Sequence, residues 1–266
     1  MTGPRKAVFL HTQKTAGTSI VEMARVAYGL HNVVSHADYV QRGLDECLSV
    51  PFVSGHFGYG FAKPIMDGRY SFTFLRDPID RLISLYSFCR SRRPEEYPIY
   101  EAAQRLSLEN FLLLAEEPSA RSNLSEWQDH RETVWNHQTW QLAQGWGCHL
   151  VGNPRKRITE FSSDELLRLA IKNVKKFDYI GFTETFDEDC INILTDIGIP
   201  PPEKILKSNA SQTKLHRDDI PRSTMALLQD FTRLDQKLYD AAWSRRTPRI
   251  LRLCRQGWRS LMYPRN

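Results

Sequence analysis

The chain has 266 residues, 41% hydrophobic and 25% charged, so it can bury a full core and is not a globally disordered protein. Its five cysteines include no C-x-x-C pair, which argues against a disulfide framework and against a zinc site. No apolar run approaches the roughly 18 residues of a membrane-spanning helix, and the first residues, MTGPRK, lack the apolar segment of a signal peptide.

Basic charge gathers at the C-terminal end of the chain. The net charge is +5, and residues 244–266 hold seven arginines and no acidic residue, which leaves −2 for the rest. We therefore expect a basic C-terminal tail at residues 244–266 that packs as a helix by its apolar side. Contact of this tail with an anionic membrane surface is the alternative.

The first predicted elements are a strand, a turn and a helix. Ala7–Leu10 is a short apolar run typical of a buried strand, and residues 20–28 carry apolar side chains at helical spacing. The turn between them contains Lys14, Gly17 and three hydroxyls, at Thr15, Thr18 and Ser19. Free N–H groups and the helix dipole favour an anion at such a helix start. We interpret this turn as a loop that binds a phosphate or a phosphosulfate.

This turn differs from the Walker loop of P-loop nucleotide-binding proteins. That loop reads GxxxxGK[ST], whereas here Lys14 precedes Gly17 and no glycine stands four residues earlier. The pattern therefore indicates an anion of a different kind from a magnesium-bound triphosphate. The alternative is a plain helix start, capped by Thr or Ser, with a solvated lysine.

The next elements are three further strands and the first helices. We expect strands at residues 32–35, 52–54 and 70–75 and a helix at residues 38–48. Strands that alternate with helices imply a parallel sheet and an α/β fold. His56 follows the second of these strands, at the carboxyl edge where α/β sheets place their ligands.

A second motif lies in residues 72–88, FTFLRDPIDRLISLYSF. It predicts a strand that ends in Arg76 and a helix that begins near Pro78, with Ser84 on the side that can face back to the strand end. An arginine fork and a hydroxyl in this arrangement can hold a phosphate. The alternative is a structural ion pair between Arg76 and Asp77, with Ser84 a surface hydroxyl.

The second half of the chain is largely helical by its pattern. Residues 90–147 are polar and helical and contain four of the six tryptophans, which form either an acceptor wall or a core. A strand is expected at Tyr179–Phe182, and helices are expected at residues 106–115, 134–143, 164–175, 187–197 and 221–243.

The two motifs TQKTAGTS and RDPIDRLISLY together resemble the sulfotransferases that use PAPS, 3′-phosphoadenosine-5′-phosphosulfate. The likeness is to the branch of the heparan and dermatan 2-O-sulfotransferases and their bacterial relatives. It extends to NHQT at residues 136–139 and YIGFTETFDE at residues 179–188. The resemblance implies a P-loop-like three-layer fold, with a central parallel sheet flanked by helices and with helical insertions. It also implies one sulfotransferase domain at residues 1–243, with an insertion near residues 90–147.

The resemblance also assigns roles to residues. In that family the first motif binds the 5′-phosphosulfate and the second binds the 3′-phosphate. The implied donor contacts are therefore Lys14, Thr15, Ala16, Gly17, Thr18 and Ser19, together with Arg76 and Ser84. Ala16 departs from the pattern, because many relatives have glycine or serine there.

Sulfuryl transfer, like phosphoryl transfer, depends mostly on positioning and electrostatics. Lys14 is the candidate to neutralise charge on the leaving phosphate oxygen. His56 is the candidate base, because it resembles the histidine proposed for that role in the 2-O-sulfotransferases and titrates near neutrality. The alternative for His56 is a buried histidine hydrogen-bonded at a strand end, and we expect His11 to pack under the loop. No cluster of ligand residues indicates a metal.

We therefore expect an O-sulfotransferase that uses PAPS, releases 3′-phosphoadenosine-5′-phosphate and sulfates a hydroxyl of a carbohydrate or another small molecule. No nucleic-acid partner is expected. One alternative is a P-loop nucleotide-dependent kinase, which would require magnesium. Another is a protein that binds a nucleotide or glycan without turnover. The expected location is the cytoplasm, with a Golgi lumenal domain lacking its anchor as the alternative.

Overall fold

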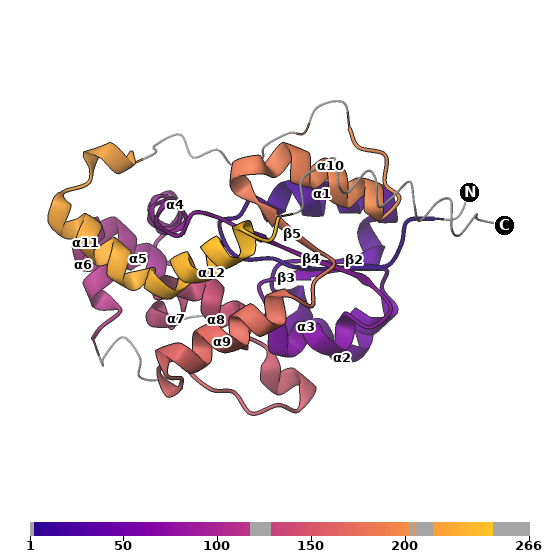
Figure 1. Cartoon of the computed structure of the whole chain (residues 1–266), viewed down its shortest axis with the longest axis horizontal. Coiled ribbons are helices and arrows are strands. Elements are labelled where there is room, and N and C mark those ends of the chain that lie inside the picture. The colour runs from indigo at the N-terminus through magenta and orange to yellow at the C-terminus, as the bar shows by residue number, and fades with distance from the viewer. Residues whose placement is uncertain (1–2, 118–128, 203–204, 206–214, 247–266) are drawn as a thin grey trace.

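The computed structural model describes residues 3–117, 129–202, 205 and 215–246. Within these ranges the chain forms a five-stranded parallel sheet of order β2-β3-β1-β4-β5 with helices on both faces (Figure 1). This confirms the predicted α/β fold class. The strands are β1 (Ala7–Leu10), β2 (Val33–Val34), β3 (Phe52–Gly55), β4 (Tyr70–Leu75) and β5 (Tyr179–Phe182).

Alternate side chains of the strands enter two different hydrophobic cores, as expected for a parallel sheet buried on both faces. Val8 and Leu10 of β1 belong to the core on one face, whereas Ala7 and Phe9 belong to the core on the other. The second of these faces is covered by α1 (Gly17–Tyr28) and α10 (Phe186–Asp196). The first is covered by α2 (Asp38–Ser49), α3 (Tyr59–Ile65), α8 (His137–Ala143), α9 (Ser163–Val174) and α12 (Arg233–Trp243).

A third cluster of helices stands beside the sheet and extends the fold on one side (Figure 1). Ile79, Leu82 and Phe111 are among its buried residues. The helices of this side are α4 (Pro78–Arg90), α5 (Pro98–Arg105), α6 (Leu108–Leu114), α7 (His130–Val134) and α11 (Arg222–Phe231). Helices α5, α6, α7 and α8 (His137–Ala143) all fall within residues 90–147, the segment expected as a helical insertion. The basic tail beyond residue 246 and Trp127 lie outside the described residues.

Two predicted helices are wrong in the same way, because each is broken at a specific residue. The expected helix at residues 134–143 is interrupted at Asn136, whose φ of 44° lies in the left-handed region. The expected helix at residues 221–243 is two helices separated at Thr232. Asn136 is involved in both breaks: its N–H donates to the carbonyl of Phe231 (2.8 Å), and its Oδ1 accepts from the N–H of Leu234 (2.7 Å).

Helix α3 was not predicted, and its start explains part of the glycine-rich stretch around His56. A Cβ on Gly58 would lie 2.0 Å from the carbonyl oxygen of Gln144, so the two backbones could not approach each other with a larger residue. The N–H of Gly60 donates to that same carbonyl (2.9 Å). None of the described helices is long and apolar enough to cross a membrane.

Candidate active site

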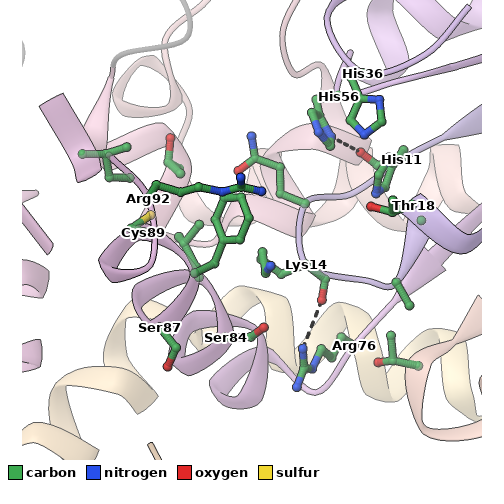
Figure 2. Close-up of a pocket in the computed structure, with 18 of the residues that line it drawn as sticks. His11, Lys14, Thr18, His36, His56, Arg76, Ser84, Ser87, Cys89 and Arg92 are labelled. Carbon is green, nitrogen blue, oxygen red and sulfur yellow. Dashed lines mark hydrogen bonds between the residues drawn. The ribbon is translucent and has the colours of Figure 1, made fainter. Parts of the chain in front are cut away.

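A cavity of about 990 Å³ lies at the carboxyl edge of the sheet, and residues that follow all five strands line it. Figure 2 shows it in close-up, with Lys14, His36, His56 and Arg76 among the labelled residues. From one edge of the sheet to the other, its lining includes His36 after β2, His56 after β3, Lys14 after β1, Arg76 after β4 and Thr183 after β5. In the sheet, β2 and β3 lie on one side of β1, and β4 and β5 lie on the other, so the direction in which the chain adds strands reverses at β1. Such a reversal leaves a crevice where α/β proteins bind ligands.

The loop after β1 is held in an unusual backbone conformation. Lys14 and Ala16 both have left-handed φ angles, 69° and 62°, which non-glycine residues adopt only when their surroundings impose them. His11 lies directly under the loop, because a Cβ on Gly17 would stand only 2.1 Å from its Nε2. The His11 ring in turn stacks on Phe9, with ring centroids 5.0 Å apart. This placement agrees with the expectation that His11 packs under the loop.

The three hydroxyls of the loop have different environments. Thr18 lines the cavity. Thr15 is buried and its Oγ1 donates to the carbonyl of Thr12 (2.7 Å), so this hydroxyl closes the turn. Ser19 is also buried and is not part of the cavity lining. The cavity therefore receives one hydroxyl of the loop, together with Lys14, Ala16 and Gly17.

Helix α1 begins without a side-chain cap, so the alternative of a Thr or Ser cap is wrong. Its N-cap residue is Ala16, and its first turn contains no acidic residue. The first N–H groups of a helix have no partner within the helix, and the helix dipole gives this end partial positive charge. The start of α1 is therefore suited to bind an anion in the cavity.

Lys14 places a cation in a half-buried position beside this helix start. Its Nζ lies 3.9 Å from the ring centroid of Phe88. Burial, together with the nearby cations Arg76 and Arg92, lowers the pKa of the ammonium to about 8. The side chain is therefore mostly protonated at neutral pH, and because it is partly desolvated its charge acts strongly on a neighbouring anion.

One ring nitrogen of His56 carries no hydrogen and can accept a hydrogen bond. Its Nδ1 lies 2.9 Å from the carbonyl oxygen of His11, and because a carbonyl can only accept, Nδ1 must carry the hydrogen. The lone pair is then on Nε2. Burial lowers the pKa of the ring to about 4, so His56 is neutral at physiological pH. The imidazoles of His11 and His36 lie beside it, with ring centroids at 4.5 and 5.7 Å.

Arg76 and Ser84 line the same cavity from β4 and α4. Arg76 Nη1 donates to the carbonyl of Lys14 (3.2 Å), which links the two predicted anion sites directly. Asp77 serves other partners: its Oδ1 accepts from the N–H of Asp80 at the start of α4 and lies 3.5 Å from Arg217. Among the described residues Arg76 and Asp77 form no ion pair with each other. The alternative reading of this motif, a structural ion pair between these two residues, is therefore wrong.

The aromatic side of the cavity was not predicted. It is formed by Phe88, Tyr97 and Tyr100, with Arg92 stacked 4.4 Å from the Phe88 ring centroid. The four-residue spacing of Ser84, Phe88 and Arg92 places them on one face of α4 and its continuation, and this spacing is visible in the sequence.

The tryptophans were expected to form either an acceptor wall or a core, and the acceptor wall is wrong for those that the structure describes. Trp140 and Trp146 are fully buried against each other, with ring centroids 5.3 Å apart. Trp135 packs between two hydrophobic clusters. Among the residues that the structure describes, no three His, Cys, Asp or Glu side chains are arranged to hold a metal ion.

A family model described as the sulfotransferase family matches residues 1–241, which is most of the chain. No curated protein matches the sequence.

Proposed function

The chain belongs to the sulfotransferase family and is a transferase of sulfo groups, and we propose that it moves a sulfuryl group from PAPS to a hydroxyl acceptor. This family excludes the kinase alternative. The observation that carries the proposal is the convergence of two cations, Lys14 and Arg76, and one neutral imidazole, His56, on a single cavity. An anionic donor needs the cations, and a hydroxyl acceptor needs the base.

The lining of the cavity fits the two anionic ends of PAPS. We assign the 5′-phosphosulfate to Lys14, the backbone of Ala16 and Gly17, Thr18 and the start of α1, and the 3′-phosphate to Arg76 and Ser84. The bond from Arg76 to the Lys14 carbonyl keeps the two anion sites at a fixed separation. In this assignment Thr15 and Ser19, which were expected as donor contacts, hold the loop in shape through buried positions.

His56 acts as the general base in this proposal. Its Nε2 takes the proton of the acceptor hydroxyl, while the His11 carbonyl holds the ring in the required tautomer. Lys14 neutralises the charge that develops on the leaving phosphate oxygen. The donor supplies the activated sulfuryl group. An anion bound near His56 favours its protonated form, which raises its pKa from about 4 toward the range where a base is effective.

We assign the acceptor to the aromatic side of the cavity and propose a carbohydrate as its class. Phe88, Tyr97 and Tyr100 offer flat apolar surfaces, which suit the C–H faces of a sugar ring. The likeness to the 2-O-sulfotransferase branch supports the same class. We further propose the cytoplasm as the compartment, because the four described cysteines, at positions 47, 89, 148 and 190, are free thiols.

Transfer of ³⁵S from labelled PAPS to a panel of oligosaccharides, in the presence of EDTA, tests this proposal. We expect labelled product from the wild type, and a loss in kcat of about 100- to 10,000-fold in His56→Asn, with KM for PAPS little changed. His31→Asn alters an exposed histidine and should match the wild type. Absence of transfer to any hydroxyl would contradict the proposed reaction, and an unchanged rate in His56→Asn would contradict the assigned base.

A further inference from the structure

Helix α8 is completely buried although much of its sequence, HQTWQLA, is polar. His137, Gln138, Thr139 and Gln141 are all at most 1% exposed. Buried polar side chains are retained in proteins when they make hydrogen bonds, so their partners indicate what such a helix does. For the two glutamines, these partners are backbone groups of the candidate active site.

Gln138 holds the backbone of Arg76 by two hydrogen bonds. Its Oε1 accepts from the N–H of Arg76 (3.0 Å), and its Nε2 donates to the carbonyl of Arg76 (3.0 Å). Arg76 follows the last residue of β4, where the strand pairing ends. The side-chain amide of Gln138 therefore makes the backbone hydrogen bonds that a neighbouring strand would otherwise make to this arginine, which is the residue assigned to the 3′-phosphate.

Gln141, one turn later on the same helix, holds the base side of the cavity. Its Nε2 donates to the carbonyls of Phe57 (3.0 Å), His11 (3.3 Å) and His56 (3.3 Å). The His11 carbonyl is the one that accepts from His56 Nδ1 and so sets the tautomer of the base. The Oε1 of Gln141 is buried without a partner among the described residues. The three carbonyls of the site therefore determine the orientation of this amide, and that orientation leaves its oxygen buried without a hydrogen bond, which costs free energy.

Helix α8 is fixed at both ends by groups outside the cavity. At its start, the Asp235 carboxylate accepts from the N–H groups of Gln138 (3.2 Å) and Thr139 (2.7 Å). At its end, Asn173 Nδ2 donates to the carbonyls of Leu142 (2.9 Å) and Ala143 (3.1 Å). The helix is thus held at both ends by side chains that do not line the cavity.

We propose that Gln138 and Gln141 are positioning residues: Gln138 aligns Arg76 for the 3′-phosphate of the donor, and Gln141 aligns the His11 carbonyl and His56 for proton transfer. The inference rests on the proposed function, which assigns those roles to Arg76 and His56. Because both glutamines belong to one buried helix, α8 sets the distance between the donor grip and the base.

Two substitutions on the same helix test the inference, each serving as the control for the other. Gln138→Met and Gln141→Met keep the length of the side chain and remove its hydrogen bonds. We expect Gln138→Met to raise the Kd of 3′-phosphoadenosine-5′-phosphate about tenfold, with kcat at saturating donor little changed. We expect Gln141→Met to lower kcat about 10- to 100-fold with Kd within about twofold of the wild type. General loosening of the fold would not separate the two quantities in this way.

A spectroscopic readout separates failure of this inference from failure of the proposed function. The ¹⁵N shifts of His56 should show a single Nδ1–H tautomer in the wild type and in Gln138→Met, and a mixture in Gln141→Met, without any donor or acceptor present. Ile193→Ala, which truncates a buried side chain of the core on the other face of the sheet, should lower stability while leaving Kd, kcat and tautomer unchanged. The positioning roles are wrong if the tautomer is the same in all variants and the two methionine variants do not separate Kd from kcat. That includes the case in which both variants change both quantities and the case in which they change neither. If the wild type itself binds no nucleotide, the proposed function fails while the tautomer still decides the role of Gln141.

Discussion

If the proposed function is right, Lys14 makes the affinity of the cavity for anions depend on pH. Its ammonium is half-buried against the Phe88 ring, and burial, with the neighbouring Arg76 and Arg92, lowers its pKa from 10.5 to about 8. The protonated form attracts a phosphate, whereas the neutral amine does not. Since a bound anion stabilises the charged form, binding must be coupled to protonation of this residue once the pH exceeds 8.

We expect the Kd of 3′-phosphoadenosine-5′-phosphate to be nearly constant between pH 7 and 7.5 and to rise above pH 8, approaching about tenfold per pH unit. Lys14→Met should bind more weakly at pH 7 and should lose this rise. Titration calorimetry at pH 7, 8 and 9 measures both effects. Lys63→Met, which changes an exposed lysine on α3, is the matched control. An equally steep rise in Lys14→Met would show that another group is responsible.

At the residue scale, the sequence predicts the cavity-facing Lys14, His56, Arg76 and Ser84, because each follows from a strand end or a helix face. It cannot separate Thr18 from Thr15 and Ser19. The sequence gives no reason to distinguish these three hydroxyls. Which of them faces the cavity is decided by the left-handed backbone at Lys14 and Ala16. Their roles as donor contacts stay predictions.

At the scale of elements, α8 and α12 cap each other. Asn136, directly before α8, accepts from the N–H groups of Leu234 (2.7 Å) and Asp235 (3.2 Å) at the start of α12. Asp235 in turn accepts from the first N–H groups of α8. A side-chain oxygen at a helix start stabilises it, and an Asn tolerates the left-handed φ that the geometry requires here.

Asn136→Ala should therefore lower the free energy of unfolding by about 2 kcal/mol, because it removes the cap of α12 and the polar side chain that lets Asn tolerate a left-handed φ. Asn136→Gly loses only the cap and should cost about 1 kcal/mol. Asn136→Asp keeps an acceptor oxygen and is the control. Urea unfolding at pH 7 measures all three. Equal stability of the Ala variant and the wild type would mean that the mutual capping contributes nothing.

The same residue explains which elements the sequence can predict. The sheet strands and α1, α4, α9 and α10 follow from local patterns and are found within a few residues of their expected limits. The break at Thr232 does not follow, since Phe231, Leu234 and Leu238 continue the helical spacing across it. It is produced by the hydrogen bonds of Asn136 with Phe231 and Leu234. Asn136 is distant in sequence, so the local spacing of apolar residues cannot reveal these bonds.

On the scale of the whole molecule, folding keeps several histidines neutral. Burial lowers the pKa of His56 and His130 to about 4, and it lowers the pKa values of His11, His36 and His137 as well. An unfolded histidine titrates near 6.5. The unfolded chain therefore binds more protons than the folded one between pH 6.5 and 4, so stability is present above this window and is lost as the pH falls through it.

We expect the free energy of unfolding to fall by more than about 1.4 kcal/mol per pH unit between pH 6 and 5. Glu132, whose pKa burial raises to about 7, and Asp235, whose pKa is also raised, act in the opposite direction, but they are outnumbered. Urea unfolding at pH 7, 6 and 5 measures the dependence. His130→Gln, remote from the cavity, should make it less steep. Stability that stays constant or increases toward pH 5 would contradict the neutral state of these rings.

The position of the site in the molecule follows from the sequence, whereas the shape of the cavity does not. Two motifs at strand ends predict donor contacts at one edge of a parallel sheet, because such ends meet there. The aromatic side of the cavity depends on how α4 and α5 pack beside the sheet. The sequence pattern suggests tryptophans as the aromatic residues of a site, whereas the cavity is lined by Phe88 and Tyr100. Trp140 and Trp146 prove to be core.

The proposed function requires that one cavity, lined by both Lys14 and Arg76, binds the nucleotide of PAPS without a metal. Calorimetric titration with 3′-phosphoadenosine-5′-phosphate in EDTA, on the wild type, Lys14→Ala and Arg76→Ala, tests it directly. We expect tight binding to the wild type and a loss of about tenfold or more in each variant, since each removes a charged partner of a phosphate. No binding by the wild type, or binding of ATP only with magnesium, would contradict the proposed function.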